Sequence, residues 1–386
     1  MKNALVDVII PVFKQFELVR QCIDSLLAAD CRTQHTIVVI DDCSGEPELS
    51  AHLADLAELG AIELHTNRQN LGFTRTVNFG MRLHPDRDVV LLNSDTIAYP
   101  QWLDRICAAA LSAKDIATVN PMTTQFGSHI SCYPGLTGKF EEALEVEDRR
   151  LDAIARDVNA GRRIAVHTTV GFCMYISRKA LNDIGYFDVE NFPVAYGEET
   201  DFCYRASKAG WRHLVAGDVF ITHLEGRSYG DRKAAMMADM LDRIVRLHPE
   251  VPHHDRQFQD TDPVRPIRTA IDLGRIRRLL DGASRLTVAT DRGSAATRRS
   301  PWLLFDFERA EVSLQTPAYP AESFPNVGVF RFPDDIARFN AALKALCIEE
   351  LDFATPEVRA AFKAATTPIH PDELGLAVSL GRKATH

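Results

Sequence analysis

Short, uninterrupted apolar runs alternate with amphipathic helical patterns over the first hundred residues. Strands are predicted at residues 6–11, 36–40 and 89–92, because each run is rich in valine, isoleucine or leucine and ends at polar or turn residues. Apolar residues recur at helical spacing in residues 18–27 and 74–83, and a later strand is predicted at residues 168–176. Strands without polar alternation are buried on both faces. The pattern therefore predicts an α/β fold in which helices flank a mostly parallel sheet.

Size, charge and cysteine usage narrow the class of protein. The chain has 386 residues, enough for two or three domains, and a formal net charge of -9, which argues against nucleic-acid binding through bulk positive charge. Its eight cysteines include no CxxC pair, so reduced thiols are expected. Residues 1–4 lead straight into a strand rather than a signal peptide, and no apolar run reaches the ~18 residues of a membrane span. We expect a cytoplasmic protein.

The sequence becomes polar and contains several prolines from about residue 249. We predict one domain over residues 1–250, a polar linker and basic helix over residues 251–284, and a small accessory α/β module over residues 285–386. The arginines of the basic helix are Arg265, Arg268, Arg275, Arg277 and Arg278. This helix could rest on an anionic membrane surface as a peripheral contact, or pack on the first domain with its arginines in water. The sequence leaves both readings open.

The loops that follow the predicted strands carry acidic and small residues. Parallel sheets bind ligands past the carboxyl ends of their strands. Here those ends read Asp41-Asp42 and Asn93-Ser94-Asp95, without the glycine-rich fingerprints of dehydrogenases or P-loop enzymes. A strand-end carboxylate such as Asp95 can simply end a turn, or it can hold a divalent ion that neutralises a diphosphate.

Seven segments, taken in order, resemble the family 2 glycosyltransferases, which are inverting, nucleotide-sugar-dependent enzymes with the GT-A fold. The segments are VDVIIPVFKQ, VVIDDCS, NRQNLGFTRTVNFG, LLNSDT, TVGFCMYISRKALNDIGYFD, GEETDFCYRASKAGW and HLEGRS. The branch they most resemble includes bacterial O-antigen and rhamnan glycosyltransferases. The resemblance implies transfer of a sugar from a UDP- or dTDP-sugar to a saccharide or lipid-linked saccharide acceptor, with Mn²⁺ or Mg²⁺, in bacterial surface polysaccharide synthesis. It does not indicate the sugar, the linkage or the oligomeric state.

The resemblance also assigns a donor site. Asp41 would accept a hydrogen bond from N3–H of uracil or thymine, and Asp95 would coordinate the metal ion. Asn93 stands where the family carries the first aspartate of its DxD signature, and Phe13 stands where the family usually has tyrosine. The remaining residues assigned to the nucleotide are Pro11, Val12, Asn70, Gly72, Arg75 and Ser94.

Two later segments complete the expected site. Glu199 is the candidate general base at the family's ED step, a glutamate in place of the usual aspartate, and Glu198 or Asp201 could take part. Alternatively, the only role of these acids is to begin a helix, because carboxylates at a helix N-terminus interact favourably with the helix dipole. His223 matches the family's HxxGxS motif as a metal ligand. Arg227 and Ser228 of that motif would close over the diphosphate.

Two other classes of protein remain open. A catalytically silent relative that only binds a nucleotide or glycan would account for Asn93 and for the glutamate at position 199. A sugar nucleotidyltransferase is disfavoured, because it should carry a glycine-rich loop after the first strand, where this chain reads PVFKQFE.

Overall fold

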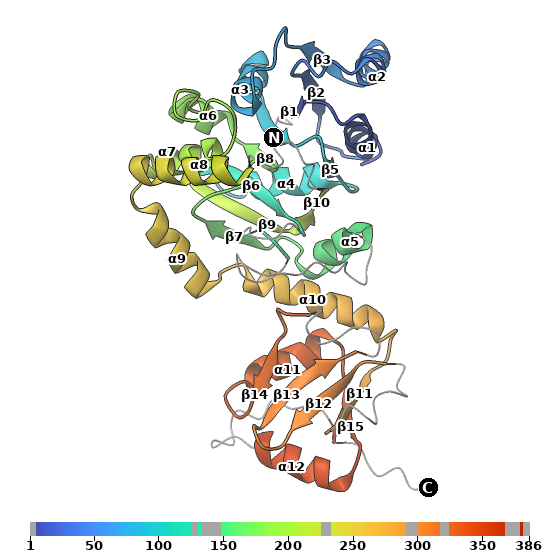
Figure 1. Cartoon of the computed structure of the whole chain (residues 1–386). Coiled ribbons are helices and arrows are strands. Elements are labelled where there is room, and N and C mark those ends of the chain that lie inside the picture. The colour runs from blue at the N-terminus through green and yellow to red at the C-terminus, as the bar shows by residue number, and fades with distance from the viewer. Residues whose placement is uncertain are drawn as a thin grey trace. The chain divides into compact units, whose positions relative to one another are not determined.

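The computed structural model describes residues 5–124, 130–132, 148–224, 233–290, 300–316, 324–366 and 379–380. The chain divides into two compact units (Figure 1). The first comprises Met1–Lys139 and Asn159–Val264, and the second comprises Phe140–Val158 and Arg265–His386.

An eight-stranded sheet forms the centre of the first unit, in the order β3-β2-β1-β4-β8-β6-β9-β7. Its strands are β1 (Val6–Val12), β2 (His35–Asp41), β3 (Glu63–Thr66), β4 (Asp88–Leu92), β6 (Ile116–Met122), β7 (Arg163–Val166), β8 (Cys173–Ile176) and β9 (Arg212–Phe220). The first four strands in that order are mutually parallel, and so are β6 and β9. Strand β8 runs antiparallel to both β4 and β6, and β7 runs antiparallel to β9. The mixed α/β architecture with a mainly parallel sheet is the one predicted.

Helices flank this sheet on both sides (Figure 1). They are α1 (Phe16–Leu27), α2 (Pro47–Glu58), α3 (Phe73–Leu83), α4 (Trp102–Ala110), α6 (Arg178–Ile184), α7 (Glu198–Lys208), α8 (Lys233–Leu247) and α9 (Val251–Thr261). Helix α3 lies very close to the sheet at Gly80. A Cβ there would come within 2.7 Å of Ile9 Cγ2 and 2.8 Å of Ile40 Cδ1. This close packing fixes the position of α3 against β1 and β2.

Two expected elements differ from the prediction in the first unit. Residues 168–176 were expected as one strand, but only Cys173–Ile176 is a strand. Before it, the backbone of Val170 pairs with the side chain of Asn120, at 2.6 Å from Val170 N to Oδ1 and 2.9 Å from Nδ2 to Val170 O. Residues 251–261 were expected as a polar linker, but they form α9. Its proline lies in the first turn, where no helical hydrogen bond is lost.

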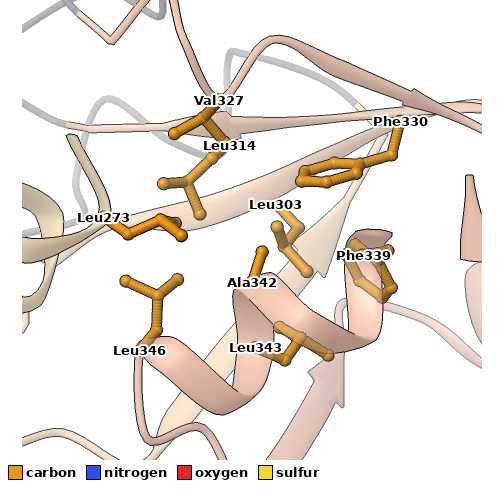
Figure 2. Close-up of a pocket in the computed structure, with 9 residues that line it drawn as sticks. All are labelled: Leu273, Leu303, Leu314, Val327, Phe330, Phe339, Ala342, Leu343 and Leu346. Carbon is orange, nitrogen blue, oxygen red and sulfur yellow. The ribbon is translucent and has the colours of Figure 1, made fainter. Parts of the chain in front are cut away.

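The second unit contains a six-stranded sheet in the order β14-β13-β12-β11-β15-β16. Its elements are α5 (Asp148–Val158), α10 (Arg265–Leu279), β11 (Arg285–Ala289), β12 (Trp302–Asp306), β13 (Glu311–Gln315), β14 (Val329–Arg331), α11 (Ile336–Ala345), β15 (Glu350–Phe353), α12 (Pro356–Thr366) and β16 (Ser379–Leu380). Figure 2 shows Leu303 and Leu314 of the sheet facing Ala342 and Leu343 of α11, with Leu273 of α10 beside them. The apolar space that these side chains line belongs to the core of this unit.

Two arginines of the basic helix α10 are buried within the second unit. Arg275 Nη1 lies 2.7 Å from Asp272 Oδ1, and Arg268 Nε donates to Asn326 Oδ1 at 3.0 Å. Asp272 Oδ2 also accepts from the backbone N–H and the side-chain amide of Asn326, at 3.0 and 2.9 Å. Arg268 and Arg275 therefore support the core of this unit, so the reading that places the arginines of this helix in water is wrong for these two, while Arg265, Arg277 and Arg278 are exposed.

Among the described residues, no helix has both the length and the apolar character needed to span a membrane.

Candidate active site

The carboxyl ends of β1, β2 and β4 meet at one edge of the first sheet. Val12 pairs in register with Asp41, and Ile9 pairs with Leu91 two residues before Asn93. The predicted donor-site residues at these strand ends therefore lie along the same edge, with Phe13 exposed just past β1. Parallel strands explain this grouping, because their carboxyl ends always share an edge.

The loops after β1 and β2 are joined to each other. Asp41 is buried, and its Oδ1 accepts the backbone N–H of Ser44 at 2.9 Å. The Ser44 hydroxyl in turn accepts the backbone N–H of Lys14 at 2.8 Å. Lys14 and Gln15 both have left-handed backbone conformations, with φ of 64° and 65°. Two consecutive non-glycine residues in this region are unusual, and such backbone is concentrated at functional sites.

Asp42 organises the next loop, although no role was predicted for it. Its Oδ1 accepts from Asn67 Nδ2 at 2.7 Å and from the backbone of Leu71 at 2.8 Å, and its Oδ2 accepts from the backbone of Gly72 at 2.9 Å. Asn70 Oδ1 also accepts from Gly72 N, at 3.2 Å. The only sequence signal for this role is a second acid after a buried strand.

The start of α3 contacts the segment that precedes α7. Gly72 has φ of 80°, and a Cβ there would lie 3.2 Å from Val194 Cα. The Thr74 N–H donates to Val194 O at 3.2 Å. Arg75, which was predicted to approach the diphosphate, donates from Nη1 to Pro193 O at 2.9 Å. These contacts bring the loops of the donor site next to the chain that leads to Glu198 and Glu199.

Asp95 and His223, the two predicted metal ligands, lie side by side. Asp95 Oδ1 is 3.2 Å from His223 Nε2. A two-residue antiparallel ladder between β5 (Thr96–Ile97) and β10 (Thr222–His223) brings them together, and Leu224 N–H extends it by donating to Asp95 O at 2.8 Å. The two side chains are only 13% and 9% exposed.

Asn93 and Phe172 surround the imidazole of His223. Asn93 Nδ2 is 3.4 Å from His223 Nε2, and Ser94 lies between Asn93 and Asp95 on the same loop. The Phe172 ring stacks on the imidazole with centroids 5.1 Å apart, while its carbonyl accepts the Asn93 N–H at 2.8 Å. The strand-end loop of β4 and the imidazole are thus held by the same phenylalanine.

The chemistry of this pair suits a divalent ion that arrives with a diphosphate. Among the described residues, no group of three or more His, Cys, Asp or Glu side chains is arranged to hold a metal. Mg²⁺ commonly takes one or two carboxylates from the protein and the remaining oxygens from phosphates and water, while imidazole nitrogen is a better ligand for Mn²⁺. Asp95 and His223 fit an open site of this kind.

Glu198 and Glu199 begin helix α7 directly after Gly197. Gly197 has φ of 97°, and a Cβ there would come within 2.6 Å of Phe192. Glu198 is 3% exposed, and within the described part of the chain its Oε2 has no hydrogen-bond partner. Burial, with the neighbouring charge of Glu199, raises the pKa of Glu198 well above its ordinary value. Burial and the charge of Glu199 therefore favour the neutral form of the Glu198 carboxyl group.

Glu199 is half-buried and weakly held. Its Oε2 accepts from the backbone of Gly197 at 3.2 Å, and its Oε1 accepts from the Thr200 hydroxyl at 3.5 Å. Burial is the main cause that raises the pKa of the Glu199 carboxyl. A carboxylate with a raised pKa is a stronger base, which is what proton removal from a hydroxyl requires.

Tyr196 lies within electrostatic range of the acid pair and of Asp95. Burial raises the pKa of its phenol, and the charges of Glu198, Glu199 and Asp95 act in the same direction. Its phenol is thus near enough to both centres to feel their charges. The backbone of Tyr196 is also left-handed, with φ of 67°. The sequence contains no signal for this residue.

Asp201 serves the structure of α7, since Arg205 Nε donates to its Oδ2 at 2.8 Å and His248 Nε2 lies 2.9 Å from its Oδ1. Arg227 and Ser228 lie outside the described residues, so their contact with the diphosphate stays a prediction.

Comparison with known proteins identifies the family of the chain. The model of "Glycosyltransferase like family 2" matches residues 3–240. An uncharacterized glycosyltransferase of Haemophilus influenzae is 30% identical over 108 residues, which cover 28% of this chain and 33% of that protein. The match thus spans about a third of that relative's length.

Two solved structures share part of the architecture. GalNAc-T7 with UDP, GalNAc and Mn²⁺ has a TM-score of 0.44 and 15% identity, over 57% of this chain and 44% of that one. The mannosyltransferase PcManGT from Pyrobaculum calidifontis, in complex with GDP-Man and Mn²⁺, has a TM-score of 0.45 and 14% identity, over 72% and 76%. The family model matches well over half of the chain and confirms the predicted enzyme class and GT-A fold. The chain belongs to the glycosyltransferase like family 2.

Proposed function

We propose that this protein transfers a sugar, with inversion at the anomeric carbon, from a UDP- or dTDP-sugar to a saccharide acceptor. The observation that carries the proposal is the pairing of Asp95 with His223 at the carboxyl edge of the sheet, together with the contacts between the start of α3 and the segment that leads to the acid pair of α7. A donor-binding edge and a basic carboxylate on separate elements are the two parts that a single displacement needs.

The donor nucleotide would occupy the edge formed by β1, β2 and β4. Asp41 would accept from N3–H of the base through the lone pairs that Ser44 leaves available, and the exposed ring of Phe13 would stack on the base. Gly72 lets the start of α3 approach this edge closely. Asp95 and His223 would hold Mn²⁺ or Mg²⁺, which when bound neutralises the negative charge of the diphosphate.

Glu199 would act as general base in the transfer step. Its carboxylate takes the proton of the acceptor hydroxyl while that oxygen forms a bond to the anomeric carbon. The bond from that carbon to the diphosphate oxygen breaks, and its electron pair leaves with the nucleoside diphosphate. Burial favours the neutral form of Glu198, which reduces the negative charge beside the base.

The acceptor would be a growing bacterial surface polysaccharide, free or lipid-linked, at the cytoplasmic side of the membrane. Arg265, Arg277 and Arg278 of α10 are exposed and could contact anionic lipid. Cosedimentation with anionic and neutral vesicles decides whether a peripheral membrane contact exists.

A direct assay tests the proposal. The protein is incubated with UDP- and dTDP-sugars, Mn²⁺ or Mg²⁺ and a panel of oligosaccharide acceptors, and the anomeric configuration of the product is read by NMR. We expect metal-dependent transfer with inversion. Product of retained configuration would refute the mechanism. Nucleotide binding without any transfer or hydrolysis would identify a catalytically silent relative.

A further inference from the structure

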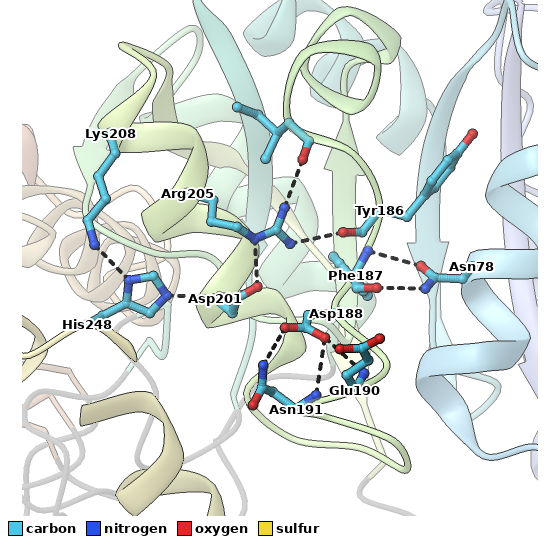
Figure 3. A network of polar contacts seen from close by, with 11 residues as sticks. Asn78, Tyr186, Phe187, Asp188, Glu190, Asn191, Asp201, Arg205, Lys208 and His248 are labelled. Atoms are coloured by element: carbon cyan, nitrogen blue, oxygen red, sulfur yellow. Dashed lines mark hydrogen bonds and ion pairs between the residues drawn. The ribbon is translucent and has the colours of Figure 1, made fainter. Parts of the chain in front are cut away.

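Asp201 lies in the first turn of α7, two residues after the proposed base. Its side chain is 5% exposed, and both carboxylate oxygens are engaged. Oδ1 lies 2.9 Å from His248 Nε2, and Oδ2 accepts from Arg205 Nε at 2.8 Å (Figure 3). A buried carboxylate whose two oxygens both form charge-assisted hydrogen bonds holds together the segments that carry its partners.

The protonation state of His248 follows from its second neighbour. Lys208 Nζ lies 3.0 Å from His248 Nδ1, and an ammonium group can only donate. Nδ1 must therefore be the acceptor, and the ring proton resides on Nε2, where it is donated to Asp201. Glu250 holds Lys208 in place with a 2.9 Å ion pair. In the contact between Asp201 and His248, the Nε2–H of the imidazole is therefore the donor and the carboxylate is the acceptor.

These contacts join three segments that surround the acid pair. His248 directly follows α8, so its bond to Asp201 ties the end of α8 to the first turn of α7. Arg205 donates to the carbonyls of Ile184 and Tyr186, at 3.0 and 2.9 Å, and so ties in the segment after α6 (Figure 3).

The far side of that segment is bound to α3. Asn78 Nδ2 donates to Phe187 O at 2.8 Å, and Phe187 N donates to Asn78 Oδ1 at 3.1 Å (Figure 3). The chain between α6 and α7 is therefore held by Arg205 of α7 on one side and by Asn78 of α3 on the other.

We propose that Asp201 and His248 are positioning residues for the transfer reaction, and that they orient the first turn of α7 so that Glu199 faces the acceptor hydroxyl. This inference rests on the proposed function. Glu199 depends on such support, because its own two hydrogen bonds are long, at 3.2 and 3.5 Å. A displacement of about 1 Å in a reacting group can cost about 100-fold in rate.

The chain offers a matched control at the opposite edge of the sheet. Asp7 is buried near the start of β1, and it contacts His84 Nδ1 at 2.8 Å and Arg87 Nη1 at 2.9 Å. This cluster has the same three residue types as Asp201, His248 and Arg205, but it lies away from the carboxyl edge. His84→Leu therefore removes a comparable contact without touching the proposed site.

The experiment compares His248→Leu, His248→Gln and His84→Leu in the full chain. Glutamine keeps an N–H donor where Nε2 lies, and leucine removes it. For His248→Leu we expect kcat to fall about 10- to 100-fold with donor KM changed less than about twofold. His248→Gln should retain kcat within about threefold. His84→Leu should lower Tm as much as His248→Leu does but leave kcat unchanged.

A second variant keeps the test available if His248→Leu does not fold. His248→Asn then replaces it, because the asparagine amide is one bond too short to reach Asp201.

Hydrogen exchange of the α7 amides separates this inference from the proposed function. Faster exchange at residues 197–202 in His248→Leu, restored in His248→Gln, supports the anchor even if no transfer is found for the wild type. Unchanged exchange overturns the inference. Faster exchange with unchanged kcat also overturns it, because the anchor would then not serve the reaction.

Discussion

The two edges of the first sheet use buried charge in different ways. At the amino edge, both oxygens of Asp7 are paired, with His84 and Arg87, and Arg87 also donates to Thr36. At the carboxyl edge, Glu198 keeps a buried oxygen without a partner in the described chain. An unpaired buried polar atom costs stability. The amino edge also has one, Arg178 Nη1, so the difference between the edges lies in the charges that meet there. Asp7 faces two basic side chains, whereas Glu198 lies beside a second carboxyl group, that of Glu199, which is the arrangement expected where charge serves a ligand rather than the fold.

Glu199→Gln should give the largest effect on the carboxyl edge. Glutamine cannot accept the acceptor proton, so turnover should fall by about 10²- to 10⁴-fold, while donor affinity by calorimetry stays within about twofold. Near-normal turnover in this variant would move the base to another residue.

Asp7→Ala should give the largest effect on the amino edge. Removing the carboxylate leaves His84 and Arg87 without their shared partner, and the free energy of unfolding should fall by about 3 kcal/mol. Urea denaturation measures this loss. The kcat of the folded fraction should equal that of the wild type, and a large fall in kcat would contradict the division between the two edges.

Asp95→Ala should weaken the affinity of the nucleoside diphosphate in the presence of Mn²⁺ by about 10- to 100-fold, because one of two protein ligands is lost. Asn93→Asp is the matched variant, and it should strengthen the same affinity by adding a carboxylate. Calorimetry with and without Mn²⁺ checks both. Equal affinity for wild type and Asp95→Ala would remove Asp95 from the site.

Glu198→Gln should give the smallest effect, and one that depends on pH. Burial raises the pKa of Glu198 in the folded protein, so the neutral acid favours folding below the unfolded pKa, and this advantage is lost as pH rises through the folded pKa. Glutamine cannot ionise, so the variant should gain about 2–4 °C in Tm over the wild type at pH 8, and less at pH 5. A Tm difference that is the same at every pH would refute the assignment.

Periodicity in the sequence predicted the parts of the fold that are locally consistent. Strands β1, β2 and β4 are mainly apolar runs, and their order and direction explain why the proposed donor-site residues share an edge. Strand β6 was missed because Asn120 and Pro121 interrupt its pattern. In the structure Asn120 is buried, and its amide donates to the carbonyls of Val170 and Cys173, a non-local compensation that no window of sequence shows.

The candidate site divides in the same way. The resemblance to a family placed Asp95, His223 and Glu199, whereas Asp42 and Tyr196 depend on contacts between distant segments. Asp201 was considered beside Glu199 as a reacting acid, but its position between Arg205 and His248 could be seen only in three dimensions.

The short ladder between β5 and β10 determines when, during synthesis and folding, Asp95 and His223 can meet. Asp95 is synthesised early, but its imidazole partner emerges only after β9 has been made, so the proposed ion-binding pair depends on contacts far apart in the chain. Closing such long loops costs chain entropy and slows folding. If the pair binds manganese as proposed, manganese affinity would report whether the ladder between β5 and β10 has formed, and a nascent chain that stops after α6 would carry half of the pair.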